Sequence, residues 1–196
     1  MRDFLRRYWR TLTRPSAYYS LGFLTIGGFI GGLLFWGAFN TALEATNTET
    51  FCIGCHEMRD NVYAEFKGTI HDTNRSGVRA ICSDCHVPRE PGALIVRKMR
   101  ATFELWGHIT GVVDTPAKFE AHRAMLAQRV WKRMKETDSI ECRNCHKRES
   151  MDPERQSEKA KARHAKGLAE GKTCIDCHFG IAHKEPAGPG PMEIKY

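Results

Sequence analysis

The sequence predicts a mainly α-helical chain with little regular secondary structure: one N-terminal membrane helix followed by a small extramembrane domain. Three observations carry this prediction. Residues 15–43 contain no charged side chain, as expected for one membrane span. All eight cysteines of the 196 residues lie in repeats of a single C-x-x-C-H pattern. Hydrophobic residues make up 41% of the chain and charged residues 27%, which excludes a polytopic membrane protein and a large aliphatic core.

The uncharged segment contains a nearly continuous apolar run from Leu21 to Phe39, LGFLTIGGFIGGLLFWGAF. At 1.5 Å per residue, this run extends about 28 Å as a helix, close to the roughly 30 Å hydrocarbon thickness of a bilayer. Tyr18, Tyr19 and Trp36 are aromatic residues of the kind that gather at membrane interfaces. We therefore expect a transmembrane anchor over residues 18–43.

The charges before this run indicate its orientation, because an excess of basic residues marks the cytoplasmic side. Residues 1–17 are thus predicted to be a cytoplasmic tail, and residues 44–196 to lie outside the cytoplasm. A cleavable signal peptide is the alternative, but the apolar run exceeds an ordinary signal core of about 7–15 residues. The arginines of the tail are Arg2, Arg6, Arg7, Arg10 and Arg14, against the single acidic residue Asp3.

Two overlapping G-x-x-x-G patterns within the apolar run allow a second helix to approach closely. They are formed by Gly27, Gly28, Gly31 and Gly32. The pattern is compatible with a homodimer, but glycine is common in membrane helices of every kind. The arginine tail also supplies most of the net charge of +7, so the exterior part retains only about +3 and gives no support to nucleic-acid binding.

Four repeats carry the chemistry of the chain. In C-x-x-C-H, the two thiols form thioethers with one haem and the adjacent histidine binds its iron. Structural zinc sites also use C-x-x-C pairs, but zinc does not require a histidine directly after the second cysteine, and a disulfide scaffold would not confine every cysteine to one spacing. The repeats are CIGCH (Cys52, Cys55, His56), CSDCH (Cys82, Cys85, His86), CRNCH (Cys142, Cys145, His146) and CIDCH (Cys174, Cys177, His178).

Four covalently bound c-type haems are therefore expected outside the cytoplasm. Since each haem would serve about 35 to 40 residues, the porphyrins would form most of the core. The predicted fold class is mainly α with low regular secondary structure: a single N-terminal transmembrane helix plus a tetrahaem cytochrome c domain, residues 44–196, whose core is built from haems. Helices are expected over residues 92–113 and 119–134, and within 153–170.

Five histidines outside the repeats compete for the second axial positions. His183 follows His178 by five residues, on the same local turn, and is expected to bind a neighbouring haem. His164 lies on the thin apolar stripe of an otherwise polar helix, which favours a ligand. His71 lies in a segment without apolar periodicity and is also interpreted as a ligand.

The remaining candidates are more ambiguous. His122 shares a helix face with Phe119 and Leu126, which favours ordinary packing. His108 is interpreted either as a ligand or as a proton acceptor. Met58 follows His56 by two residues, and a thioether is a haem ligand that raises the potential, although a methionine is more often core packing.

The arrangement resembles the NapC/NirT family of membrane-anchored tetrahaem cytochromes over essentially the whole chain. The shared features are the Arg-rich tail, one anchor, CIGCHEM soon after it, a second repeat about 30 residues later, then CRNCH and CIDCH with a histidine five residues on. The run DTPAKFEAHR is most similar to the branch that serves periplasmic nitrate reductase. The resemblance implies a chain of the bacterial inner membrane that oxidises membrane quinol and passes electrons to a periplasmic reductase or its cytochrome subunit.

The resemblance also implies axial pairs. Met58 takes the position of a methionine that ligates the first haem, which leaves His56 an orienting role. The other implied pairs are His86 with His183 at the second haem, His71 with His146 at the third and His164 with His178 at the fourth, where relatives differ.

A quinol site is expected near the first repeat, which begins about 13 residues after the apolar run. Residues 92–113 interleave apolar side chains with Arg97, Lys98 and Arg100, which predicts a segment in the membrane interface; a helix that merely covers the second haem is the alternative. By the resemblance, Lys98 corresponds to a family lysine near the quinol, and Glu104 lies nearest to the place of a family carboxylate beside the first haem.

Three functions remain open on the sequence. The leading one is a quinol dehydrogenase acting as an electron-transfer subunit for nitrate reductase, or alternatively for nitrite or other periplasmic reductases. The others are a multihaem reductase acting directly on a small substrate, which would need an open iron, and a haem-bearing anchor that only docks an enzyme. Basic residues near the third and fourth repeats offer a docking surface to a partner: Lys147, Arg148, Lys159, Lys161 and Lys166.

Overall fold

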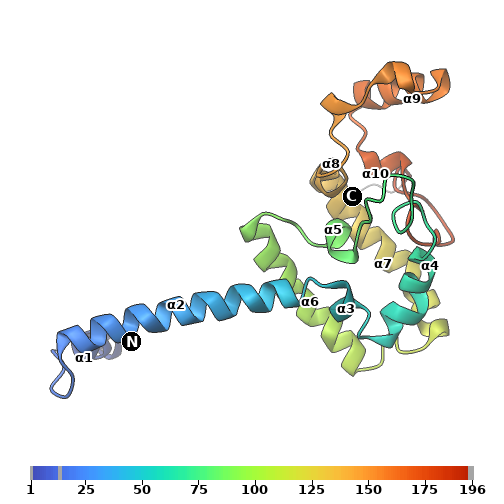
Figure 1. The fold of residues 1–196 in the computed structure, drawn as a ribbon. Helices are drawn as coiled ribbons and strands as arrows, with labels where there is room; N and C mark the ends of the chain where they lie inside the picture. Colours follow the sequence, from blue (N-terminus) through green and yellow to red (C-terminus); the bar gives the residue numbers. More distant parts are fainter. Residues whose placement is uncertain (1, 13–14, 194–196) are drawn as a thin grey trace. The chain divides into compact units, whose positions relative to one another are not determined.

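The computed structural model describes residues 2–12 and 15–193, and Arg14 of the predicted basic tail lies outside these ranges. The described residues form helices, turns and loops without a β-strand, which confirms the predicted fold class. The chain divides into two compact units, Met1–Ala45 and Thr46–Tyr196. Figure 1 shows the helices of each unit.

Helices α1 and α2 make up the first unit. α1 spans Arg2–Leu12 and α2 spans Leu21–Ala45. The 25 residues of α2 extend about 37 Å, and this helix is long and apolar enough to cross a membrane. None of its residues is buried, and a Cβ added at Gly27 or Gly31 meets nothing within 4 Å. The glycine face is therefore open, and its use in a dimer stays a prediction.

The second unit consists of short helical segments around two long helices. The long helices are α6 (Pro91–Ile109) and α7 (Pro116–Glu136), and α9 (Glu158–Ala169) is of intermediate length. The short segments are α3 (Glu49–Cys52), the π-helix η1 (Met58–Tyr63), α4 (Ala64–Phe66), α5 (Cys82–His86), α8 (Ile140–Arg143), the 3₁₀ turns η2 (Arg148–Ser150) and η3 (Pro153–Arg155), and α10 (Cys174–Cys177).

A few residues set the limits of the long helices. Pro91 and Pro116 stand in the first turn of α6 and α7, where the missing N–H would have no helical partner. Thr115 caps α7 by accepting a hydrogen bond from the amide three residues on, at 3.3 Å. α6 ends before Gly111, whose φ of +69° is readily adopted by glycine. The helix expected over residues 92–113 is therefore shorter at its C-terminal end.

Apolar packing in the second unit is sparse. A cluster of Trp131, Met134 and Ile175 forms its centre, and the Trp131 and Phe179 rings lie 5.8 Å apart in an edge-on arrangement. Among the described residues, the other buried apolar side chains are those of Phe66, Phe119 and Pro191. A core this small is insufficient for a unit of about 150 residues, as expected if bound groups supply further apolar surface.

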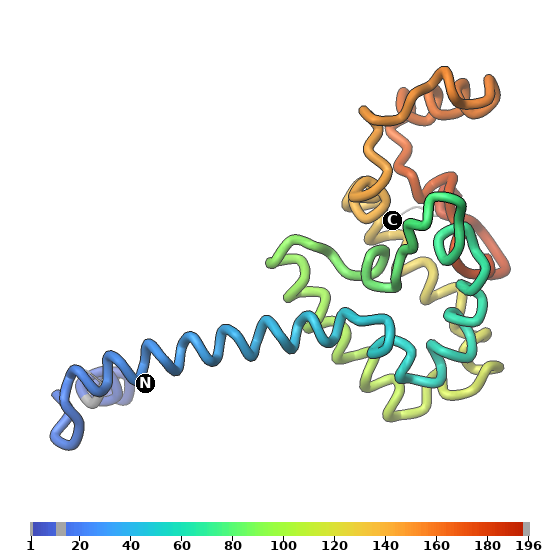
Figure 2. The backbone as a smooth tube through the Cα atoms, in the orientation of Figure 1, coloured from blue at the N-terminus to red at the C-terminus, as the bar shows by residue number. Residues whose placement is uncertain are grey.

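A left-handed turn joins α7 to α8. Asp138 and Ser139 have φ angles of 50° and 51°, which are uncommon for residues other than glycine. The Ser139 side chain is fully buried, and its hydroxyl accepts a hydrogen bond from the Ile175 amide at 3.1 Å. The turn thus fixes the start of the third repeat against the fourth. Figure 2 shows the chain leaving α8, carrying α9 and returning to α10.

Candidate haem centres

We call the four repeats centres 1 to 4 in chain order. Those of centres 2 to 4 fold as a single helical turn, whereas in centre 1 helix α3 ends at Cys52 and a turn leads to Cys55. The amide of His146 donates to the Cys142 carbonyl at 2.8 Å, and the amide of His178 to the Cys174 carbonyl at 2.9 Å. A helical turn places residues three and four apart on one face, so in centres 2 to 4 both cysteines and the histidine of the repeat lie on the same side. None of the eight cysteines forms a disulfide, which leaves every sulfur for a thioether.

An aspartate caps two of these turns. The Asp84 carboxylate accepts a hydrogen bond from the Ile81 amide at 2.9 Å, and that of Asp176 from the Thr173 amide at 2.8 Å. Asp176 is buried and paired with the Lys135 ammonium at 2.8 Å. Burial opposes ionisation, but the hydrogen bonds from Lys135 and Thr173 outweigh it and lower the pKa of Asp176. The cap therefore remains charged, and it holds the helical turn of centre 4.

Each repeat histidine faces one histidine from elsewhere in the second unit. Two imidazoles bound to opposite sides of one metal ion, at about 2 Å per bond, have ring centres roughly 6 Å apart. The residues therefore fit a bis-histidine iron at every centre. The ring-centroid separations are 6.0 Å for His56 and His108, 6.1 Å for His86 and His183, 6.3 Å for His71 and His146, and 6.0 Å for His164 and His178.

The second ring nitrogen of three outer histidines meets a hydrogen-bond acceptor. Nδ1 lies 3.0 Å from the Val62 carbonyl in His183, 2.7 Å from Oε1 of Gln156 in His164, and 2.5 Å from Oε1 of Glu57 in His108. Since these oxygens only accept, Nδ1 donates in each case and Nε2 keeps its lone pair. This is the outer-shell pattern typical of metal-binding histidines.

Centre 2 also meets the requirement that a ligand histidine be neutral. Burial, followed by the charges around His183, Arg133 and Arg97, lowers the pKa of His86 to about 3. Burial likewise lowers the pKa of His183. Both imidazoles are therefore uncharged at neutral pH.

His71 differs from the other outer histidines. Its Nδ1 atom is buried and has no hydrogen-bond partner among the described atoms. Its position is instead held through the backbone, since its carbonyl accepts from the Ala80 amide at 3.0 Å.

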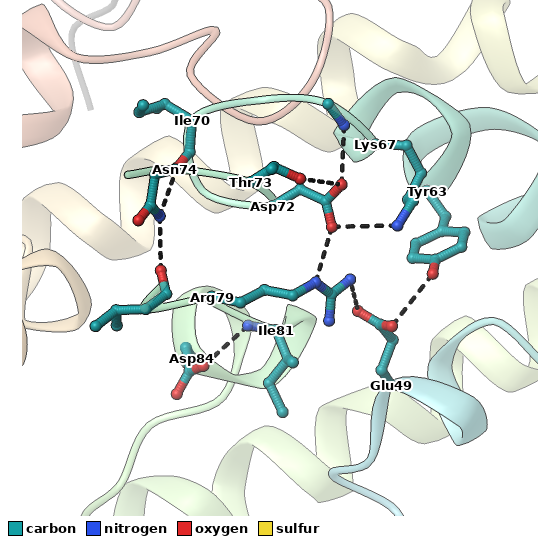
Figure 3. Close-up of polar contacts among 12 residues, drawn as sticks. Glu49, Tyr63, Lys67, Ile70, Asp72, Thr73, Asn74, Arg79, Ile81 and Asp84 are labelled. Carbon is teal, nitrogen blue, oxygen red and sulfur yellow. Dashed lines mark hydrogen bonds and ion pairs between the residues drawn. The ribbon is translucent and has the colours of Figure 1, made fainter. Parts of the chain in front are cut away.

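A cluster of hydrogen bonds encloses the loop that carries His71 (Figure 3). The Arg79 guanidinium donates to Asp72 and to Glu49, both at 2.8 Å. Lys67 adds an ion pair to Asp72 at 3.3 Å, and the Tyr63 hydroxyl donates to Glu49 at 3.2 Å. Arg79 therefore ties the residue after His71 to the helix that begins centre 1.

The cluster keeps its carboxylate ionised. The amide of Gly68 and then the guanidinium of Arg79 hold the pKa of Asp72 well below its ordinary range. We call Glu49, Asp72 and Arg79 the loop clamp.

Centre 1 has a buried carboxylate that the sequence did not indicate. The Glu57 side chain is only 2% exposed, its Oε1 is also 3.8 Å from His56 Nε2, and its Oε2 has no partner among the described atoms. The nearest sequence signal is its position directly after the repeat histidine. Met58, the predicted ligand, is half-buried at the start of η1, where its amide donates to the Cys55 carbonyl at 3.1 Å. The ring arrangement favours His108 over Met58 as the partner of His56.

Each centre contacts the next one along the chain. Helices α3 and α5, which carry Cys52 and Cys82, pack against each other, which joins centres 1 and 2. The Arg133 guanidinium donates to the carbonyls of His86 at 2.8 Å and Cys85 at 3.2 Å and lies 3.7 Å from the buried Glu141 carboxylate, which joins centres 2 and 3. The Ser139 bond described above joins centres 3 and 4.

The two predicted quinol-site residues on α6 lie in different surroundings. Lys98 is half-buried, and its ammonium donates to the carbonyl and hydroxyl of Thr46, both at 2.9 Å. Burial lowers the pKa of Lys98. Glu104 is largely exposed and pairs with Arg97 at 2.9 Å. Because Arg97 donates to the His86 carbonyl, this pair belongs to centre 2.

The remaining predicted sites are solvent-facing. His122 Nδ1 donates to the Lys118 carbonyl of its own helix at 2.8 Å, as expected for an ordinary helical histidine. In the predicted basic docking surface, Arg148 pairs with Asp138 at 3.3 Å, Lys161 with Glu154, and Lys166 with Glu170 at 3.7 Å.

Comparison with known proteins agrees with this geometry. Residues 14–188 match the model of the NapC/NirT cytochrome c family, N-terminal region. The denitrification system component NirT of Stutzerimonas stutzeri is 58% identical over 90% of this chain and 88% of its own length. The cytochrome c-type protein NapC is 57% identical in Paracoccus pantotrophus, over 91% of this chain and 76% of the relative. NapC of Escherichia coli K12 is 54% identical over 93% of this chain and 90% of its own length.

No solved structure matches the chain. The family match nevertheless spans all four repeats and implies covalently bound c-type haem, as the cysteine spacing predicted. The chain therefore belongs to the NapC/NirT cytochrome c family and is a membrane-anchored multihaem cytochrome of electron transfer.

Proposed function

We propose that the protein oxidises membrane quinol and delivers the electrons to a periplasmic reductase, with nitrate reductase as the principal acceptor. The single observation that carries the quinol step is the bond between Lys98 and Thr46. Thr46 directly follows α2, the candidate membrane helix. A half-buried ammonium is thereby held beside the first residue after the candidate membrane helix.

The exposed face of α6 supports a site at the lipid surface. Ile95, Met99, Trp106 and Ile109 follow one another at helical spacing, and all four are between 41% and 66% exposed. An apolar helix face of this kind with flanking cations is typical of an interfacial helix. Lys98 stands at the edge of that face, so we assign its ammonium as the polar group that a quinol bound on the face would contact.

The proposed ligand set follows the histidine pairs. Each centre would hold one haem c, four in all, through the sulfurs of its two cysteines and the imidazoles of its two histidines. Haem iron with two imidazoles supplies low-potential one-electron transfer. His108 then holds iron, and Lys98 is the proposed hydrogen-bond donor to the quinol oxygen. Glu104 is retained as a secondary candidate at the edge of the site.

The proposed orientation follows the arginine tail. Residues 1–17 are assigned to the cytoplasm and the second unit to the periplasm, which agrees with the excess of basic residues before α2. A homodimer through the open glycine face remains part of the proposal, because no side chain of the described residues covers it.

Nitrate reductase is proposed as the acceptor because relatives named NapC resemble the chain over most of its length. A second candidate is a reductase of denitrification, which the NirT relative favours at 58% identity. Both acceptors lie outside the membrane, so the same electron route serves either.

The test uses the full-length holoprotein in vesicles. A quinol analogue should reduce its haems, while nitrate or nitrite alone should not reoxidise them until a purified reductase is added. Lys98→Met should slow reduction by quinol by at least tenfold without changing the dithionite-reduced spectrum, whereas Lys159→Met on exposed α9 should leave the rate unchanged. Direct reoxidation by either oxyanion, or an unimpaired Lys98→Met variant, would refute the proposal.

A further inference from the structure

Helix α1 separates apolar and charged side chains onto opposite faces. Phe4, Leu5, Tyr8 and Trp9 follow the spacing i, i+1, i+4, i+5, which places them on one side of an α-helix. These side chains are between 60% and 69% exposed, and the Phe4 and Tyr8 rings stack at 6.2 Å. The helix thus presents a continuous aromatic and aliphatic surface.

The opposite face is basic. Arg2, Arg6 and Arg10 follow at i, i+4 and i+8, with Arg7 and Asp3 between them. This face carries four positive charges against one negative charge. A topology signal alone requires basic residues before the membrane helix but no particular arrangement around α1. The segregation therefore needs a second explanation.

The chain itself brings α1 to the bilayer. Only residues 13–20 separate α1 from α2, and a link of that length spans at most about 30 Å. A membrane surface offers what both faces require, since its acyl boundary accepts apolar side chains and its anionic headgroups attract arginines. We propose that α1 is a binding site for anionic phospholipid, lying in the membrane interface with its arginines on the headgroup phosphates.

This inference rests only on α2 as the membrane anchor and is independent of quinol oxidation. Aromatic and arginine residues at the ends of a membrane helix set its depth and tilt. By binding anionic lipid next to α2, α1 would fix how deeply the anchor sits. A second copy of the chain is the competing occupant of the apolar face, and the experiment below separates the two.

The test reads the membrane depth of each face in the full-length holoprotein. Because all eight native cysteines are assigned to haem, an introduced cysteine is the single free thiol and accepts a nitroxide label. Tyr8→Cys reports the apolar face and Asp3→Cys the basic face. Collisions with oxygen, which partitions into lipid, are compared with collisions with a water-soluble nickel chelate. Vesicles of phosphatidylcholine alone are compared with vesicles that also contain phosphatidylglycerol.

With phosphatidylglycerol, the Tyr8 label should favour oxygen and the Asp3 label the nickel chelate. In phosphatidylcholine alone, the contrast should largely disappear. Arg6→Gln with Arg10→Gln should lower the ratio of membrane-bound to water-exposed helix about 25-fold, since each basic residue near an anionic surface contributes roughly fivefold. The matched control, Lys159→Gln with Lys166→Gln on α9, should leave the ratio unchanged.

Three outcomes would overturn the proposal. Equal contrast in both vesicle types would show that anionic lipid is not the ligand. Two water-exposed labels in phosphatidylglycerol would show that α1 does not bind the interface. Dipolar broadening of the Tyr8 label that grows with the protein-to-lipid ratio would show that a second copy covers this face. An unchanged haem spectrum in every variant ensures that each result refers to folded protein.

Discussion

The Nδ1 atom of His183 lies 3.0 Å from the carbonyl oxygen of Val62, 121 residues earlier in the chain. The π-helix after centre 1 therefore orients the histidine that faces His86 in centre 2. Because a carbonyl only accepts, the bond leaves Nε2 as the metal-binding nitrogen of His183. The corresponding acceptors are an amide at His164 and a carboxylate at His108, so the charge behind the ligand differs from one centre to the next.

This difference predicts that two substitutions shift the reduction potentials of centres 1 and 4 in opposite directions. Glu57→Gln should raise the potential of centre 1, because the ferric state loses a negative charge bonded to its ligand. Gln156→Glu should lower the potential of centre 4 for the opposite reason. Spectroelectrochemical titration of the holoprotein resolves both shifts. Potentials that stay within experimental error in both variants would contradict an outer-shell role for these side chains.

The structure and the family resemblance indicate different ligands for centre 1: His108 by the ring arrangement and Met58 by the resemblance. The ring arrangement predicts that His108→Ala converts centre 1 to high-spin iron, while Met58→Leu leaves every centre low-spin. The two variants can be compared by electron paramagnetic resonance and magnetic circular dichroism. High-spin signal in Met58→Leu alone would restore the methionine as ligand.

The C-x-x-C-H spacing alone predicted covalently bound c-type haem, which the family match implies. This prediction needed no tertiary information, because the residues of a repeat are neighbours in the chain, as in the helical turn of Cys142 and His146. Apolar periodicity likewise predicted α7, because its buried face is continuous along the chain. The predicted limits were less accurate. The Thr115 cap precedes the segment predicted over residues 119–134, and Gly111, with its positive φ, ends α6 inside the segment predicted over residues 92–113.

The residues that the sequence did not reveal are buried charged groups. Glu57, Arg123 and Glu141 are almost fully covered, yet their residue types are typical of the surface. Their burial depends on partners far away in the sequence, as in the pairing of Arg123 with Glu65 over 58 residues. The contact of Lys98 with Thr46 spans 52 residues, so periodicity in α6 could place the lysine on a helix face but not beside Thr46.

The loop clamp predicts a local effect at centre 3. Arg79→Met removes both bonds that tie the His71 loop to Glu49, so His71 should lose its fixed position facing His146. We expect a partial high-spin signal at centre 3, smaller than the complete conversion in His71→Ala. Arg75→Met, which changes an exposed arginine of the same loop, should leave the spectrum unchanged. A wild-type spectrum in Arg79→Met would show that the loop clamp does not position His71 at centre 3.

The ion pair of Glu65 and Arg123 holds the His183 loop. The guanidinium contacts both carboxylate oxygens at 2.7 and 2.9 Å, and the Lys184 amide donates to Glu65 at 3.0 Å. Both side chains are about one-tenth exposed. Removing one partner of a buried pair costs about 3–5 kcal/mol, so Arg123→Met should lower the thermal unfolding temperature and loosen His183.

The same pair predicts the direction of a pH dependence. Burial opposes ionisation of Glu65, but the hydrogen bonds from Arg123 and Lys184 outweigh it and hold the pKa of Glu65 below its usual value. A carboxyl with a depressed folded pKa stabilises the protein above its unfolded pKa of about 4.3 and loses that contribution as pH falls through the folded value. The unfolding temperature of the native holoprotein should therefore exceed that of Glu65→Gln at pH 7, and the gap should shrink below about pH 4.3. Glu149→Gln, an exposed control, should give no gap at either pH, and a gap for Glu65→Gln that widens in acid would reverse the assigned sign.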